Sequence, residues 1–123
     1  GGDPKNGALA VGAYPRTGQT LQFQRRDSET ADAELSALLA QSRTQLGGRP
    51  IYGGCLTVCN GRGSRLFGTP NHDAGLVQDQ LGSTAITGFF GHGELGPVAR
   101  QNFLHGYTAS LGLFVPKSTT LPR

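Results

Sequence analysis

The feature of this sequence that most constrains its fold is a helical pattern that lies between runs typical of β-strands. Residues 28–46 place apolar side chains three and four positions apart, which forms one stripe along a helix. Ser28 is a candidate N-cap, and Gly47 with Gly48 ends the pattern. The stripe consists of Ala31, Leu35, Leu38, Leu39 and Leu46. A helix with one apolar side needs a second layer to pack on, and the neighbouring runs predict a sheet as that layer.

Five strand-like runs and a shorter helix accompany this helical pattern. The runs cover residues 7–13, 20–26, 51–59, 85–91 and 103–115. The shorter helix is capped by Asp73 and ends at Gly82. The predicted order is therefore ββαβαββ. Because strand–helix–strand units favour parallel neighbours, we expect the second, third and fourth runs to be parallel and the outer two antiparallel.

These elements predict an α+β fold, a mixed five-stranded sheet with two helices packed on it. We expect one domain over residues 1–115, and a tail or linker at 116–123. The chain has 123 residues, of which 15% are charged. This length fits one modest core.

The composition argues against two classes of partner. The net charge is +3, and the nine Arg and two Lys are scattered, whereas nucleic-acid modules show a basic stripe with interleaved aromatic residues. No stretch reaches the ~18 consecutive apolar residues of a membrane span. We therefore expect neither nucleic acid nor membrane as a partner.

The two cysteines lie on one predicted strand. Cys55 and Cys59 are four positions apart, or ~13 Å at the rise of a strand. A disulfide needs Cα atoms within about 7 Å. A reducing compartment is the simpler interpretation, and we expect a cytoplasmic location.

The predicted topology brings polar residues together at one edge of the sheet. Parallel strands two to four would end there with residues 25–27, 59–63 and 91–94, and the last run would begin there. Ligands bind preferentially at such edges. The edge is therefore the predicted site.

The glycine-rich turn at this edge is not a nucleotide loop. Gly63 and Gly68 have the GxxxxG spacing, but Thr69 and Pro70 replace the required Lys and Ser or Thr. A looser anion-binding nest with Arg62 is one interpretation, and a plain turn with exposed arginines is the other.

Metal and nucleophile chemistry have weak support. His92, Glu94 and His105 could form a facial metal site, but a glycine-rich loop without a metal is the favoured interpretation. Cys59 could be a nucleophile with a histidine as base, but cysteine is usually a buried residue. We expect no metal and no cofactor.

A set of ordered motifs resembles a known family. "CNGRG", "LFG", "HDA" and "GFFGHGELGPVARQNFLHGYTASLGLF" are similar to the C-terminal domain of the FIST sensory module, named for F-box and intracellular signal transduction proteins. The resemblance covers about residues 2–115. It implies a non-catalytic sensory domain that binds a small polar ligand, such as an amino acid or a derivative, and an upstream FIST N-terminal domain that this chain lacks.

The resemblance also implies the residues of a ligand site. By position these are Cys59, Asn60, Gly61, Arg62, Gly63, Asp73, Glu94, His105, Tyr107 and Thr108. Arg62 and Glu94 in one pocket would suit a zwitterion, and the alternative is that they pair with each other.

Two other functions stay open at this point. One is a small enzyme that uses Cys59 or His105. The other is an interaction scaffold, a homo-oligomer included, because one face of the last run carries the small residues Thr108, Ser110 and Gly112.

Overall fold

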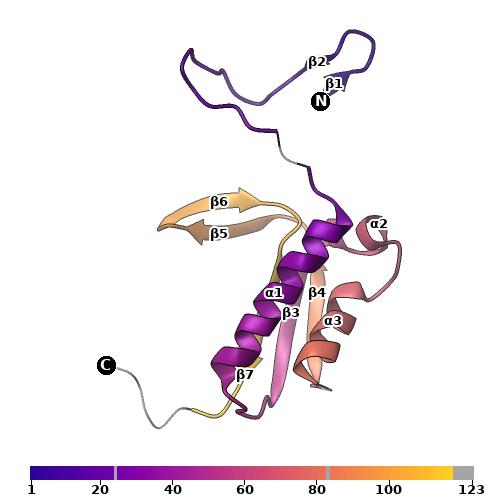
Figure 1. Ribbon diagram of the computed structural model, residues 1–123, viewed down its shortest axis with the longest axis vertical. Helices are drawn as coiled ribbons and strands as arrows, with labels where there is room; N and C mark the ends of the chain where they lie inside the picture. The colour runs from indigo at the N-terminus through magenta and orange to yellow at the C-terminus, as the bar shows by residue number, and fades with distance from the viewer. Residues whose placement is uncertain (24, 83, 118–123) are drawn as a thin grey trace.

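The computed structural model describes residues 1–23, 25–82 and 84–117 and shows an α+β fold (Figure 1). The helices are α1 (Ser28–Leu46), α2 (Ser64–Phe67) and α3 (His72–Leu81), with a 3-10 turn η1 (Asn60–Arg62). The strands are β1 (Gly2–Asp3), β2 (Ala8–Leu9), β3 (Gly53–Cys59), β4 (Ile86–Gly91), β5 (Glu94–Val98), β6 (Gln101–His105) and β7 (Ala109–Phe114).

The central sheet has the order β4-β3-β7. Strand β3 runs parallel to β4, with Leu56 opposite Gly88, and antiparallel to β7, with Leu56 opposite Leu111. The parallel pairing of the third and fourth predicted runs is confirmed, as is the antiparallel last run. Position 88 requires glycine, because a Cβ there would overlap the carbonyl oxygen of Leu56.

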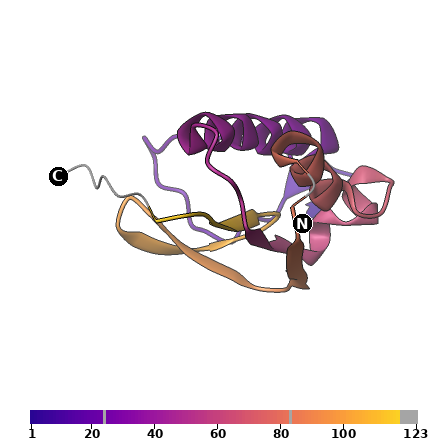
Figure 2. The same cartoon turned by 90° about the horizontal axis from the view of Figure 1, so that it is seen from below.

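Helices α1 and α3 cover one face of this sheet (Figure 2). The core between the layers consists of Leu35, Leu39, Leu56, Val58 and Val77. Alternate residues of β3 and β7 point to the opposite face, which no helix covers among the described residues. On that face the side chains of Phe89 and Phe114 are 66% and 63% exposed.

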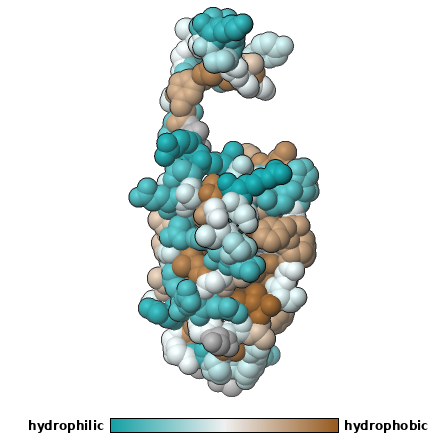
Figure 3. All heavy atoms as spheres, turned by 90° about the vertical axis from the view of Figure 1, so that its right-hand side faces the viewer, coloured by the Kyte–Doolittle hydropathy of each residue, from teal (hydrophilic) through white to brown (hydrophobic). Residues whose placement is uncertain are grey.

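The predicted five-stranded sheet is wrong, because the first two runs do not join it. Of the first run, only β2 is a strand, and it pairs with β1. In the run 20–26, Gln24 lies outside the residues that the structure describes, and none of the others is in a strand. Leu21 and Phe23 alternate as in a strand but remain exposed. The segment before α1 stands away from the body of the molecule (Figures 1 and 3), so Leu21 and Phe23 have neither a strand partner nor a layer to cover them.

The glycine-rich segment 92–102, which lies between the fourth and fifth predicted runs, mostly forms a hairpin. Strands β5 and β6 pair with each other, from Glu94 opposite His105 to Val98 opposite Gln101. Its tight turn places Ala99 and Arg100 at φ values of 47° and 74°. The run 103–115 is correspondingly broken into β6 and β7.

Smaller differences concern the helices. Asp27, not Ser28, caps α1, and its side chain accepts a hydrogen bond from the Thr30 amide. Leu38 was expected in the apolar stripe but is 58% exposed. Helix α3 begins at His72 rather than after Asp73, and the expected end at Gly82 is confirmed.

Two features concern the chain as a whole. Of the expected tail, only Pro116 and Lys117 lie in the described residues, and neither is in a helix or strand. Within the described ranges, no helix combines the length and the hydrophobicity that crossing a bilayer requires.

Candidate functional site

Arg62 is the most heavily hydrogen-bonded side chain at the predicted edge. It ends the η1 turn that follows β3, and only 5% of its surface is exposed. Its Nε donates to Asp73 Oδ2 at 2.8 Å, and its Nη2 donates to Asp73 Oδ1 at 2.9 Å. The guanidinium also lies over the ring of Phe67, 5.3 Å from the ring centroid. This two-bond geometry is the one in which Arg recognises a carboxylate most specifically.

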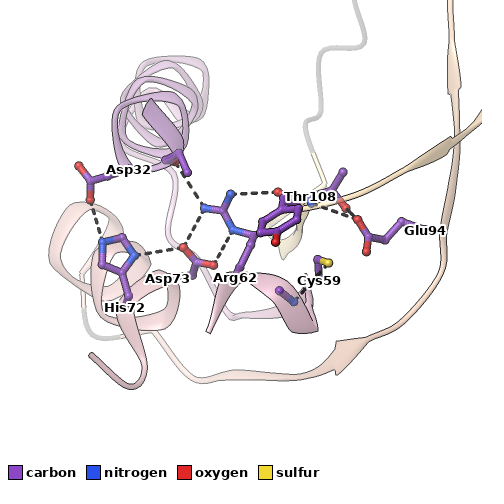
Figure 4. Close-up of polar contacts among 10 residues, drawn as sticks. Asp32, Cys59, Arg62, His72, Asp73, Glu94 and Thr108 are labelled. Carbon is purple, nitrogen blue, oxygen red and sulfur yellow. Dashed lines mark hydrogen bonds and ion pairs between the residues drawn. The ribbon is translucent and has the colours of Figure 1, made fainter. Parts of the chain in front are cut away.

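The remaining donors of Arg62 reach two further segments (Figure 4). Nη1 donates to the backbone oxygen of Tyr107 at 3.1 Å, and Nη2 donates to that of Ala31 at 3.4 Å. The side chain thus connects α1, α3 and the turn between β6 and β7. Because its charge and its donors are satisfied inside the protein, Arg62 has a structural role here.

His72 extends this network to α1. Its Nε2 lies 2.9 Å from Asp32 Oδ1, and its Nδ1 lies 3.2 Å from Asp73 Oδ1. The imidazole also stacks on the ring of Phe67, with 3.6 Å between the centroids. Neither Asp32 nor Phe67 is among the site residues predicted from the sequence. No spacing in the sequence indicates that position 32 lies beside position 72.

Tyr107 connects the network to the last strand. Its backbone has a φ of 62°, which is unusual for a residue other than glycine. Its ring lies under the guanidinium of Arg26, at 5.1 Å from the centroid. The same ring approaches Gly61 so closely that a Cβ there would lie 3.1 Å from two ring atoms. A glycine at position 61 therefore permits this packing.

A second group of predicted residues lines a cavity. Cys59, Glu94, His105 and Thr108 border a space of about 430 Å³ on the uncovered side of the sheet. The walls come from β3, β4 and β7 and from the β5–β6 hairpin. The other lining residues are Thr57, Val58, Phe89, Gly91, Gly93, Leu95, Gly96 and Ser110.

Glu94 is held in place by the start of the last strand. Its Oε2 accepts two hydrogen bonds from Thr108, from the amide at 3.1 Å and from the hydroxyl at 2.8 Å. Loss of hydration raises the pKa of Glu94, but hydrogen bonds from the Cys59 thiol and from Thr108, with the charge of His105, outweigh it. The net pKa lies below the ordinary value, so the carboxylate form is favoured.

His105 stands opposite Glu94 in the hairpin, and its Nε2 lies 3.0 Å from the carbonyl oxygen of Gly96. Because a carbonyl oxygen only accepts, this nitrogen donates. The Cys59 sulfur accepts from the Gly61 amide at 3.4 Å, and both cysteines are free thiols. The described residues contain no group of three or more His, Cys, Asp or Glu that could hold a metal ion.

Seven of the ten predicted residues thus fall into two groups. Arg62, Asp73 and Tyr107 belong to the interior network, and four others line the cavity. Arg62 and Glu94 neither share this cavity nor pair with each other, because the guanidinium binds Asp73 instead (Figure 4).

The other three predicted residues have local contacts. Asn60 lies 3.2 Å from the Nδ1 of His92, and Gly61 packs on Tyr107. A Cβ at Gly63 would lie 3.7 Å from the ring of Phe90.

Comparison with known proteins gives one family and several relatives. The family model of the FIST C domain matches residues 1–97. An uncharacterized protein of Mycobacterium tuberculosis is 48% identical over 115 residues, and one of Mycobacterium bovis is 44% identical. In both, the alignment covers 94% of this chain but only 30% of the relative. An F-box/LRR-repeat protein of Arabidopsis thaliana is 31% identical over 82% of this chain and 22% of its own length. No solved structure gives a significant match.

Proposed function

This chain belongs to the FIST C domain family of signal-transduction sensory domains, and we propose that it senses a small polar ligand bound in the cavity beside Glu94. The observation that carries this proposal is the cavity itself. Its volume of about 430 Å³ lies in the range of small-molecule sites. Its lining combines apolar side chains such as Phe89 and Leu95 with a few polar ones, which is typical of such sites.

The polar wall of the cavity is organised before any ligand arrives. Thr108 holds one oxygen of Glu94 with two hydrogen bonds. The neighbouring residue Tyr107 is bound through its carbonyl oxygen to Arg62, which is itself fixed by Asp73. A site whose side chains are already ordered loses less conformational entropy on binding. We therefore assign Arg62 and Asp73 to the support of the site rather than to contact with the ligand.

The chemistry of the wall favours binding over catalysis. A nucleophilic thiol needs a base within hydrogen-bond reach. The Cys59 sulfur accepts a hydrogen bond from the Gly61 amide at 3.4 Å. Among the described residues, no histidine is hydrogen-bonded to Cys59, and His105 donates to Gly96. The two free thiols support a reducing compartment, and we place the function in the cytoplasm.

The test is a thermal-shift screen of the full chain with small polar metabolites of both charge signs. We expect at least one compound to raise the unfolding temperature. The variant Ser110→Phe should abolish this shift, because Ser110 lines the cavity on the exposed face of β7. The matched control Ala37→Phe adds the same ring at an exposed position of α1 and should keep the shift. The proposal fails if no compound stabilises the protein, or if Ser110→Phe responds as the control does.

A second candidate function is self-association, and the uncovered face of the central sheet favours it. Phe89 and Phe114 are largely exposed there, and Ser110 and Gly112 lie on the same face. None of these four residues carries a charge, so a contact between two copies through them would bury no charged group. Large exposed apolar patches commonly mark interaction surfaces.

Sedimentation of the full chain over a range of concentrations tests this second candidate. A dimer should form, and Gly112→Trp should weaken it, whereas Leu38→Trp on α1 should not. Leu38 is a suitable control because it is exposed and apolar but lies on a helix. A monomer at all concentrations would contradict self-association.

A further inference from the structure

We propose that the cavity beside Glu94 selects a ligand with a cationic amine and disfavours a zwitterionic amino acid. This inference rests on the proposed function, because it names the chemical class that the same cavity would bind. It follows from the balance of charges, donors and acceptors in the cavity wall.

The charge of the wall is unbalanced. Among the described residues that line the cavity, Glu94 is the only carboxylate, none is a lysine or an arginine, and His105 is the one group that can carry a positive charge. Arg62, which the sequence suggested for a ligand carboxylate, does not line this cavity and is bound to Asp73, Tyr107 and Ala31. A ligand carboxylate would therefore meet Glu94 without a fixed cationic partner, whereas an ammonium group would find a counter-charge.

The hydrogen-bonding groups of the cavity wall also favour a cationic ligand. The amide and hydroxyl of Thr108 both donate to Oε2 of Glu94, which leaves Oε1 as the oxygen that these two donors do not use. The Nε2 of His105 is already engaged as a donor to Gly96, so its Nδ1 accepts when the ring is neutral. The hydroxyls of Thr57 and Ser110 also line the cavity and can donate or accept, so they do not distinguish the ligands. The preference comes from the Glu94 carboxylate, which only accepts, and a primary ammonium carries three donors.

The apolar part of the wall suits the body of such a ligand. Phe89 lines the cavity, and 66% of its side chain is exposed. An aromatic face attracts a cation and also packs against an apolar chain or ring. Leu95 of the hairpin adds a second apolar surface. The ligand class is therefore an organic cation with an apolar body and without a carboxylate close to its amine.

Isothermal titration of the full chain with matched pairs of compounds tests this inference. The pairs are phenethylamine with phenylalanine, putrescine with ornithine, and agmatine with arginine. Each pair differs by one carboxylate. N-acetylphenethylamine and 3-phenylpropionate serve as uncharged and anionic controls. We expect one or more of the amines to bind at least tenfold more tightly than its amino acid and than both controls.

Two variants connect the result to Glu94. Glu94→Gln keeps the shape and removes the charge, and it should weaken amine binding at least tenfold. Glu34→Gln makes the same change at an exposed position of α1 outside this cavity, and it should leave the affinity unchanged. Circular dichroism of each variant checks that the fold is retained.

The outcomes separate this inference from the proposed function. Equal or tighter binding of an amino acid or of 3-phenylpropionate overturns the inference, while the cavity still functions as a ligand site. Unchanged amine binding in Glu94→Gln overturns it as well. The absence of binding by every amine also overturns the inference, and the broader thermal-shift screen then decides on the proposed function.

Discussion

Arg62 and Asp73 form a buried ion pair that joins the turn after β3 to helix α3 through two hydrogen bonds, of 2.8 and 2.9 Å. Both side chains are more than 90% buried. The pair matters for function because Arg62 also holds the carbonyl oxygen of Tyr107, the residue before Thr108. Thr108 in turn holds Glu94 at the cavity. The ion pair is therefore connected to Glu94 in the proposed ligand site through Tyr107 and Thr108.

We predict that Asp73→Asn destabilises the protein by about 3–5 kcal/mol, because it leaves a buried guanidinium without its counter-charge. Urea unfolding followed by circular dichroism measures the loss. The control is Arg25→Gln, which removes the ion pair of Arg25 with Asp27 at 3.4 Å. Arg25 is 85% exposed, so the control should cost at most about 1 kcal/mol. Equal losses in the two variants would contradict a structural role for the buried pair.

The packing of Tyr107 on Gly61 gives a second prediction. Gly61→Ala places a Cβ about 3.1 Å from the ring, and the required shift should cost about 1–3 kcal/mol. The control Gly75→Ala lies within α3, where an added Cβ meets nothing within 4 Å. It should stabilise the protein by about 0.5–1 kcal/mol, because alanine is the better helix former. Opposite signs in thermal unfolding would support the packing, and a neutral Gly61→Ala would refute it.

Much of the central architecture could be predicted from the sequence, because the signals are local. The apolar spacing within 28–46 locates α1, and the order of strand, helix and strand predicts the parallel pair β3 and β4. The alternation of small and apolar residues in 109–114 assigns the two faces of β7 correctly. Each of these signals depends on neighbours in the sequence.

The remaining features depend on contacts that a local pattern does not contain. The alternation in run 20–26 resembles a strand, but a strand also needs a free sheet edge and a covered face, and the segment has neither. Tyr107 breaks the last run by adopting a positive φ, which its residue type does not indicate. The partner of Arg62 depends on how α3 packs, so the sequence offered Glu94 as one possible partner and did not indicate that Asp73 is the partner.

The turn of the β5–β6 hairpin gives a third prediction. Ala99 and Arg100 occupy left-handed conformations that favour Asn and Gly. The double change Ala99→Asn with Arg100→Gly should therefore stabilise the hairpin by about 1–2 kcal/mol. Hydrogen exchange of the hairpin amides is the suitable measurement, because a two-stranded hairpin can open without global unfolding. Exchange should slow about tenfold or more, whereas Arg100→Ala keeps the strain and should show no gain.

The lowered pKa of Glu94 gives a prediction on acid stability. Hydrogen bonds from Cys59 and Thr108 favour the carboxylate, so the folded-state pKa lies below the unfolded value of about 4.5. The folded state then binds fewer protons than the unfolded state in this range. Glu94 thus contributes stability that is complete above pH 4.5 and is lost as the pH falls through the lower folded-state pKa.

Comparison of the wild type with Glu94→Gln tests this dependence, because the variant has no charge to titrate. The difference in their free energies of unfolding should be constant near neutral pH and should shrink as the pH falls below 4.5. The pKa of Asp27 is also lowered, because its carboxylate accepts hydrogen bonds from Thr30. Asp27 is present in both proteins, so its contribution to the difference in stability cancels. A pH-independent difference between the two proteins would show that Thr108 does not favour the charged form of Glu94, and the support proposed for the cavity wall would then be wrong.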